Sequence, residues 1–235
     1  MSASGLLQLA RLLQLASPAL PVGAYSYSQG LESAVSHGIV RDAASAERWI
    51  SDVLDFSVAR MEAPLFLQCH DAWRQGDAAR AAILNEYFLA SREAGELRAE
   101  TVQMGYSLNL LLPELDVEPI PFEQPAFPVV FSRAAAAWEI AADAALLAYL
   151  WSWAENQVIA ALKAVPLGQT AGQRMLRGIG ACLPGLIGYA LQHEYSGNNS
   201  GNQRGDFAVP RGNFAPGFAL LAAKHETQYS RLFRS

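Results

Sequence analysis

The feature of this sequence that most limits its fold is the spacing of its apolar residues. They recur every three or four positions through most of the chain, and the alternation typical of a half-buried strand is nearly absent. With 235 residues, 51% hydrophobic and 17% charged, the chain can bury a core and is too apolar to be disordered. We therefore predict an all-α fold, a single-domain bundle of about ten helices over residues 1–235.

Turn and cap residues divide this pattern into segments. Asp42, Asp77 and Ser91 are placed to cap helices, and Ser26 with Gln29 forms a capping-box pattern. Five prolines predict an irregular connection over 113–128, and glycine and asparagine predict a flexible loop over 196–214. We expect helices near residues 6–16, 26–38, 43–56, 64–76, 78–90, 92–112, from 129, and over 142–165, 169–181, 185–194 and 218–227.

Residues that could carry catalysis or bind a metal are sparse. The four histidines lie outside the HExxH and ExxH spacings, and Cys69-His70 are helical neighbours that diverge too far to hold one ion readily. His193-Glu194 and His225-Glu226 are expected to be solvated pairs at helix ends. We predict no catalytic residue, no metal site and no cofactor.

Charge and hydropathy exclude two classes of partner. The net charge of −5 argues against a nucleic-acid binder. The longest low-charge run, 144–154, is shorter than the roughly 20 residues that a membrane helix needs, so no membrane association is expected. The N-terminal residues lack the order of a signal peptide, because Arg11 lies inside their apolar run. We predict a soluble, cytoplasmic protein.

Two segments are typical of recognition surfaces. The connection at 17–32 combines prolines and glycines with two tyrosines, and we single out Pro21, Gly23, Tyr25 and Tyr27 as a recognition loop. The tail, residues 224–235, mixes aromatic side chains and arginine, which dominate interface hot spots. Both segments have a structural alternative: a loop that only packs, and a tail docked on its own domain.

Four strings carry a resemblance to the UreF family of urease accessory proteins: LLQLASPALPVGAYSYSQGLE (12–32), ASREAGELRAETVQMG (90–105), LLAYLWSWAENQVIAALKAVPLGQTAGQR (146–174) and KHETQYSRLFRS (224–235). They follow one another in the family's order over nearly the whole chain. The resemblance implies an all-α homodimer without a catalytic site of its own. It also implies an adaptor that bridges a UreD/UreH-type accessory protein and the nickel-carrying GTPase UreG, for nickel insertion into apo-urease.

The resemblance also assigns residues to partners. Its tail motif implies that the UreD/UreH-type protein is bound by Tyr229, Arg231, Leu232, Phe233 and Arg234. We assign a GTPase-facing set, expected to point outward because buried charge is costly: Glu32, Glu93, Lys163, Gln169 and Arg174. A surface charge or an intramolecular pair is the plain alternative for each of the charged residues.

Two other functions stay open from the sequence. The chain could activate UreG by supplying a catalytic arginine, for which Arg174 or Arg177 would serve. An all-α metal enzyme would need a ligand cluster that the sequence does not display.

Overall fold

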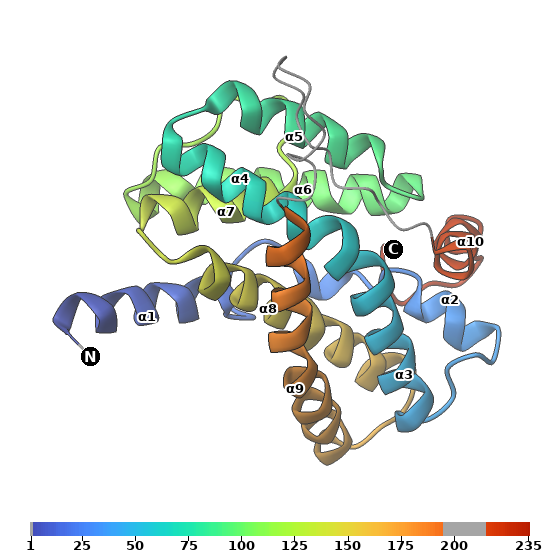
Figure 1. Ribbon diagram of the computed structural model, residues 1–235. Coiled ribbons are helices and arrows are strands. Elements are labelled where there is room, and N and C mark those ends of the chain that lie inside the picture. The colour runs from blue at the N-terminus through green and yellow to red at the C-terminus, as the bar shows by residue number, and fades with distance from the viewer. Residues whose placement is uncertain (1, 195–214) are drawn as a thin grey trace.

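The computed structural model describes residues 2–194 and 215–235, and that part of the chain is all-α, as predicted (Figure 1). Its α-helices are α1 (Ala3–Ala16), α2 (Leu31–Ser36), α3 (Ala43–Val53), α4 (Ala63–Gln75), α5 (Ala78–Ala90), α6 (Gly95–Leu111), α7 (Phe127–Ala137), α8 (Ala142–Ala164), α9 (Gln169–Glu194) and α10 (Pro216–His225). Shorter elements are the 3-10 turns η1 (Ala24–Ser26) and η3 (Leu112–Leu115), and the π-helix η2 (Leu54–Glu62).

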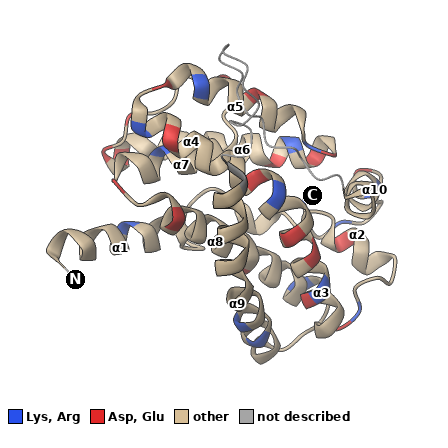
Figure 2. Cartoon of the chain, viewed as in Figure 1, with Lys and Arg blue, Asp and Glu red and all other residues tan. Residues whose placement is uncertain are grey.

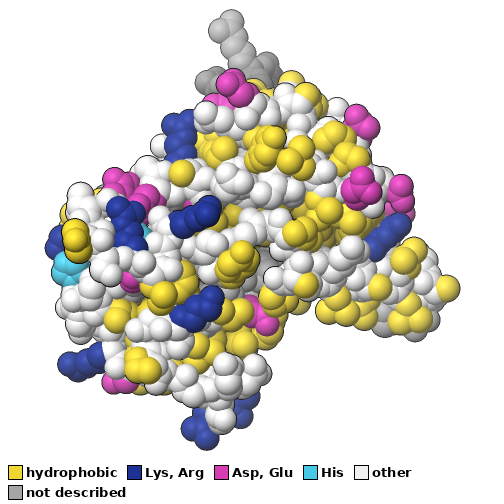
Figure 3. Space-filling view, turned by 180° about the vertical axis from the view of Figure 1, so that it is seen from behind, with side chains coloured by type: hydrophobic (Ala, Val, Ile, Leu, Met, Phe, Trp, Pro, Cys, Tyr) yellow, Lys and Arg dark blue, Asp and Glu magenta, His cyan; other side chains and the backbone are white. Residues whose placement is uncertain are grey.

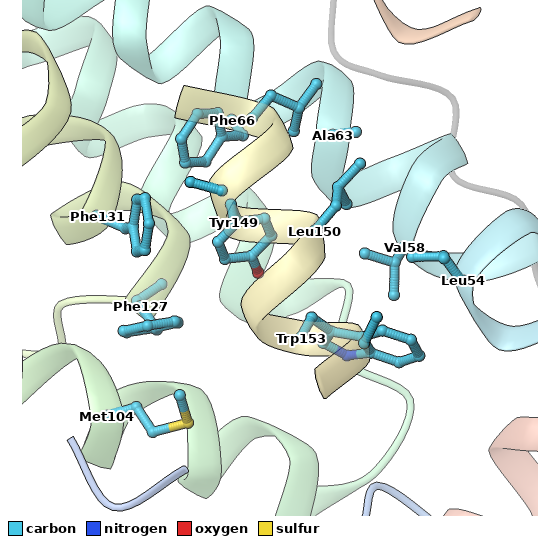
Figure 4. Close-up of a cluster of buried hydrophobic side chains, with 14 of the residues drawn as sticks. Leu54, Val58, Ala63, Phe66, Met104, Phe127, Phe131, Tyr149, Leu150 and Trp153 are labelled. Atoms are coloured by element: carbon cyan, nitrogen blue, oxygen red, sulfur yellow. The ribbon is translucent and has the colours of Figure 1, made fainter. Parts of the chain in front are cut away.

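Helices α4 and α8 form the centre of the molecule. Helix α4 packs on α5, α7, α8 and α9, while α8 packs on α1 and α9. Aromatic rings fill the space between α4, α7 and α8, with the Phe66 and Tyr149 ring centroids 5.2 Å apart and the Phe131 ring edge-on to Tyr149 (Figure 4). Such ring pairs prefer offset and edge-on arrangements, so this packing fixes how the three helices sit together.

Two predicted helix starts are wrong. Helix α2 begins at Leu31 rather than near Ser26, because Gln29 adopts a positive φ of 50° and its side chain bonds Glu100 and Trp153 instead of the helix. Helix α6 begins at Gly95, and Ser91 instead ends α5 by donating its hydroxyl to the Phe88 carbonyl. The Asp42 cap is confirmed, since its carboxylate accepts from the Ser45 amide at 2.8 Å.

A π-helix joins two segments that the sequence separates. Helices α3 and α4 were expected to be distinct, but η2 makes residues 43–75 continuous. The wider turn changes which side chains face the core: the apolar Phe56 is 46% exposed, whereas the charged Glu62 is only 6% exposed. π-Turns are rare and often mark functional sites, and this one places the Glu62 carboxylate in the interior.

The last third of the chain also differs from expectation. The predicted helices 169–181 and 185–194 are one helix, α9, which runs through Pro184. The proline-rich connection is confirmed as irregular over 116–126, where Asn109 fixes it by bonding both backbone groups of Ile120. The predicted flexible loop, 196–214, lies outside the described residues.

Helix α1 stands out from the body of the molecule. It projects sideways in Figure 1, and only Leu15 among its residues is buried. Leu6, Leu7, Leu9 and Leu13 are between 41% and 64% exposed, which gives the projecting arm its hydrophobic surface (Figure 3). No helix in residues 2–194 or 215–235 is long and apolar enough to cross a bilayer.

Candidate functional site

The tail, residues 224–235, folds back onto the body along α2 and α6. Its backbone is held by one carboxylate: Glu32 accepts hydrogen bonds from the amides of Leu232 at 2.7 Å and Phe233 at 2.9 Å. Helix α10 leads into this contact and packs on α2 and α6. Charge-assisted bonds to backbone amides are among the stronger protein hydrogen bonds, so Glu32 fixes a segment that has no regular structure of its own.

A second carboxylate, Glu96 of α6, extends the contact. It accepts from the buried ring of His225 at 2.7 Å and pairs with the guanidinium of Arg231. The other ring nitrogen of His225 lies 3.2 Å from Glu32, and the ring is fully buried. The expectation that His225 is solvated is therefore wrong, because two carboxylates of the body enclose it; the His193 side chain lies outside the described residues.

The end of the tail enters the interior. The Ser235 carbonyl oxygen accepts from the amides of Ser28 and Gln29 at 2.7 and 3.1 Å, and the Ser235 hydroxyl donates to Glu100 at 2.7 Å. The ring of Phe233 is 6% exposed, with the Lys163 ammonium 5.8 Å from its centre. The tail is thus docked on its own domain, which was one of the two arrangements considered from the sequence.

Docking divides the predicted partner-binding residues into two groups. Phe233 is buried, and Arg231 is tied to Glu96. Tyr229 is fully exposed and Leu232 is 60% exposed, although its amide is fixed by Glu32. The tail therefore presents two large apolar side chains to solvent from a backbone that is held in place.

The segment predicted to be a recognition loop is an ordered connection beside the tail. Gly23 has a φ of 77°, a conformation that glycine adopts without strain. Tyr25 is 65% exposed, with Lys163 above its ring, and Pro21 is also exposed. Tyr27 is buried; burial raises its pKa, and a hydrogen bond from Arg234 lowers it in part.

The residues assigned to the GTPase do not share one face of the chain. Lys163, Gln169 and Arg174 are exposed, and the basic positions near the start of α9 are coloured blue on the ribbon in Figure 2. Glu32 and Glu93 were expected to point outward and instead point inward. Glu32 holds the tail, while one Glu93 oxygen is buried and the other lies 3.5 Å from the Ser57 hydroxyl.

A buried polar cluster, which sequence reasoning missed, lies next to the docked tail. Glu62 of η2 accepts from Arg92 at 2.7 Å and from the Tyr149 hydroxyl at 2.6 Å. Glu100 accepts from Gln29 and Ser235, and burial raises its pKa to about 7. Burial raises the pKa of Tyr149 well above its usual value, and the adjacent Glu62 adds to that shift. The available sequence signal for Glu62 was a charge directly before the apolar run 63–67, whereas Glu100 had no comparable signal.

The thiol and imidazole chemistry of the chain is dispersed. Cys69 is buried in α4, and His70 beside it bonds the Ile140 carbonyl at 2.9 Å. Cys182 is exposed on α9. Within residues 2–194 and 215–235, no three histidine, cysteine or carboxylate side chains are grouped as a metal would require.

This fold and site define an all-α protein that displays a fixed tail and a projecting apolar helix. The UreF family model matches residues 40–180. The chain is 56% identical to urease accessory protein UreF of Azoarcus sp. strain BH72, and the match covers 99% of this chain and 98% of that protein. It is 52% identical to that of Dechloromonas aromatica, over 97% and 98% of the two chains. The chain belongs to the UreF family of urease accessory proteins, and its role lies in urease maturation as an accessory protein.

A further relative has a second part. The chain is 48% identical to the bifunctional urease accessory protein UreEF of Bordetella bronchiseptica, with the match covering 97% of this chain and 52% of that protein. In that protein a UreF-like part is therefore joined to additional sequence within one polypeptide.

Proposed function

We propose that the chain is a cytoplasmic, non-catalytic adaptor that bridges a UreD/UreH-type accessory protein and the GTPase UreG, for nickel insertion into apo-urease. The observation that carries this proposal is the docked tail, which displays Tyr229 and Leu232 from a backbone held by Glu32. A fixed backbone lowers the entropy that binding costs, and an aromatic side chain is a frequent interface anchor. These two side chains bind the UreD/UreH-type protein, while Phe233 and Arg231 hold the tail in position.

Co-purification with the UreD/UreH-type partner tests this assignment. The double substitution Tyr229→Ser, Leu232→Ser should abolish capture of the partner and leave helix content unchanged, because both side chains are already in solvent. Leu220→Ser is the matched control, since Leu220 on α10 is 63% exposed and lies outside the tail. Capture of the partner at the wild-type level by the double variant would remove the tail from the interface.

The surface proposed to face UreG contains Lys163, the recognition loop at Tyr25 and the exposed start of α9. Lys163 lies above the Tyr25 ring at 5.8 Å, so these two residues form one surface beside the tail. Lys163→Gln should weaken recruitment of UreG without lowering the melting temperature, because the side chain is exposed. A large loss of stability would instead assign Lys163 a structural role.

The alternative function, activation of UreG by a catalytic arginine, makes a different prediction. Arg174 and Arg177 are both exposed on α9. If either acts as an arginine finger, the chain should accelerate GTP hydrolysis by UreG about 10³–10⁵-fold, and the corresponding Arg→Ala variant should lose that effect. An adaptor without a catalytic arginine leaves the rate of GTP hydrolysis by UreG unchanged, whether or not either arginine is present.

We also propose that a second copy of the chain covers helix α1, which makes the adaptor a homodimer. Four leucines on one short projecting helix are unusual for an isolated domain, and apolar surfaces of this kind are typical of obligate interfaces. Leu6→Asp with Leu13→Asp should convert a dimer into a monomer in analytical ultracentrifugation. A dimer that persists in this variant would place the interface on another surface.

A further inference from the structure

A cavity of about 100 Å³ extends from the molecular surface to the buried polar cluster. The segment after α1, helix α6 and helix α8 form its walls, with Pro18, Ser152 and Asn156 among the lining residues that reach solvent. Glu62, Arg92 and Glu100 lie at the buried end. Figure 4 shows the Tyr149 hydroxyl directed toward the space between Phe127, Met104 and Trp153, all of which line the same cavity.

The charges of the cavity do not balance. Three carboxylates line it, Glu62, Glu100 and Glu155, whereas Arg92 is the one cation among the described residues of its walls. The Arg92 guanidinium is bonded to Glu62, and both side chains are 7% exposed. Glu100 is 4% exposed and receives only neutral donors, from Gln29 and Ser235. A buried carboxylate without a cation must take up a proton or a positively charged ligand.

A second feature is an unused donor on Arg92, one of the residues that line the cavity. The Nε atom of Arg92 is buried and makes no hydrogen bond to any residue that the structure describes. The side chain itself is 93% buried and its guanidinium lies 4.2 Å above the Phe88 ring, which holds it in place. A buried N–H group without an acceptor costs stability, so an oxygen atom supplied by a ligand would be stabilising there.

From these features we infer that the cavity binds a small aliphatic primary ammonium ion that carries a neighbouring carbonyl oxygen. The ammonium group pairs with Glu100, and the carbonyl oxygen accepts from Arg92. The short aliphatic stem lies against the apolar walls formed by Leu15, Leu97 and Met104. Concave apolar sites with a few convergent polar groups are the usual form of small-molecule sites.

Titration should accompany binding, because Glu100 is the group that must ionise. Besides the neutral donors, it faces Glu62 of η2, Arg92 of the connection between α5 and α6, Tyr149 of α8 and Tyr27 beside the tail. Burial makes the largest contribution to its raised pKa of about 7, and Glu62 adds to it, whereas Arg92 lowers it. A bound ammonium ion adjacent to Glu100 favours the ionised carboxylate, so binding releases a proton.

Three matched probes test the site by NMR titration of the full chain, with the indole N–H of Trp153 as the reporter. The probes are 2-aminobutanamide, butanamide, which lacks the ammonium group, and n-propylammonium, which lacks the carbonyl group. We expect saturable shifts with 2-aminobutanamide, at least tenfold weaker binding of butanamide, and intermediate binding of n-propylammonium. Equal affinities for butanamide and 2-aminobutanamide, or no saturable shift with any probe, would overturn the inference.

Two variants and one control locate the binding. Glu100→Gln should weaken binding of n-propylammonium at least tenfold, and it preserves the shape of the side chain in its uncharged state. Ser152→Leu narrows the cavity without a change of charge and should weaken all probes alike. Glu114→Gln, an exposed residue of η3, should bind as the wild type does. Unchanged affinity in both Glu100→Gln and Ser152→Leu would contradict a site in this cavity.

The pH dependence provides an independent test. The n-propylammonium ion stays charged throughout the neutral range, so its apparent affinity should follow the ionised fraction of Glu100. With a pKa of about 7 in the empty cavity, binding should be about tenfold tighter at pH 8 than at pH 6. An affinity that is constant over this range would contradict the pairing with Glu100.

Discussion

Helix α1 and the tail, residues 224–235, both expose large apolar side chains, but the structure treats them in opposite ways. Helix α1 satisfies its backbone internally and contacts the body mainly through α8, and four of its leucines lie in solvent. Beyond His225, where α10 ends, the tail has no regular structure, yet Glu32 accepts from two of its amides and Phe233 is buried. One segment is fixed by its own hydrogen bonds, and the other by carboxylates of the body.

This difference indicates two kinds of interface. An apolar helix can be covered by any complementary apolar surface, and a second copy of the chain supplies one with no further requirement of charge. A peptide whose backbone amides are fixed presents its side chains in a defined arrangement, so only a partner with a complementary surface can bind it. The arm at α1 is thus suited to assembly of like chains, and the tail is suited to recognition of a different protein.

The largest expected effect concerns the carboxylate that holds the tail. Glu32→Ala removes the acceptor for the Leu232 and Phe233 amides, and hydrogen bonds to charged groups are worth roughly 1.5–3 kcal/mol each. We expect the local stability of the tail to fall by about 4 kcal/mol, with loss of protection of both amides in hydrogen exchange. Glu114→Ala should leave them protected. Retained protection in Glu32→Ala would mean that Phe233 and Ser235 suffice to hold the tail.

The second effect is a pH dependence of the free energy of unfolding, which comes from Glu100 beneath the tail. Burial raises the pKa of Glu100 from the ordinary value of 4.5 to about 7, so between these values the folded chain binds a proton that the unfolded chain has released. The free energy of unfolding should therefore fall as pH rises from 4.5 to 7, by up to about 3 kcal/mol from this group.

Urea denaturation at a series of pH values measures this contribution as the difference between the wild type and Glu100→Gln. The variant lacks the ionisable group, so its free energy of unfolding should decline less over the same range. Parallel curves for the two proteins would show that Glu100 keeps an ordinary pKa.

A smaller effect is expected from the hydroxyl of Ser28. It donates to the Ser235 carbonyl oxygen at 2.5 Å in a buried position, and the amide of Ser28 donates to the same atom. Ser28→Ala leaves the hydrogen bond from the Ser28 backbone amide in place, so we expect the free energy that protects the tail amides to fall by about 1 kcal/mol. Ser36→Ala, which removes a hydroxyl bonded within α2, is the control and should not affect the tail. Equal protection in Ser28→Ala and the wild type would show that the Ser28 hydroxyl is not needed to hold the Ser235 carbonyl oxygen.

Local chemistry explains which parts of the fold could be predicted. Helix α8 was expected over 142–165 and spans Ala142–Ala164, because its long apolar pattern ends before Pro166. The Asp42 cap was predictable, since its partner is three residues away. Where a long-range contact competes, the local signal fails: Gln29 bonds Glu100 and Trp153 rather than capping a helix.

The candidate site was predictable in composition but not in arrangement. The tail was identified by its residue types, whereas the division between buried Phe233 and exposed Leu232 depends on Glu32, some 200 positions away. The cluster around Glu62 required the π-turn of η2, which has no reliable sequence signature. Sequence periodicity indicates which residues share a helix face, but it does not say which of two faces the rest of the chain will cover.

The smallest expected effect concerns an exposed leucine of helix α1. Leu6 is 56% exposed, so Leu6→Ser removes little buried surface within one chain. At a dilution at which the chain sediments as a monomer, its free energy of unfolding should change by less than about 0.5 kcal/mol. The matched change Leu15→Ser, at a residue that is 1% exposed, should destabilise the same monomer by several kcal/mol. A large loss in Leu6→Ser under these conditions would show that α1 folds against its own body, and the contrast between the two ends of the chain would then disappear.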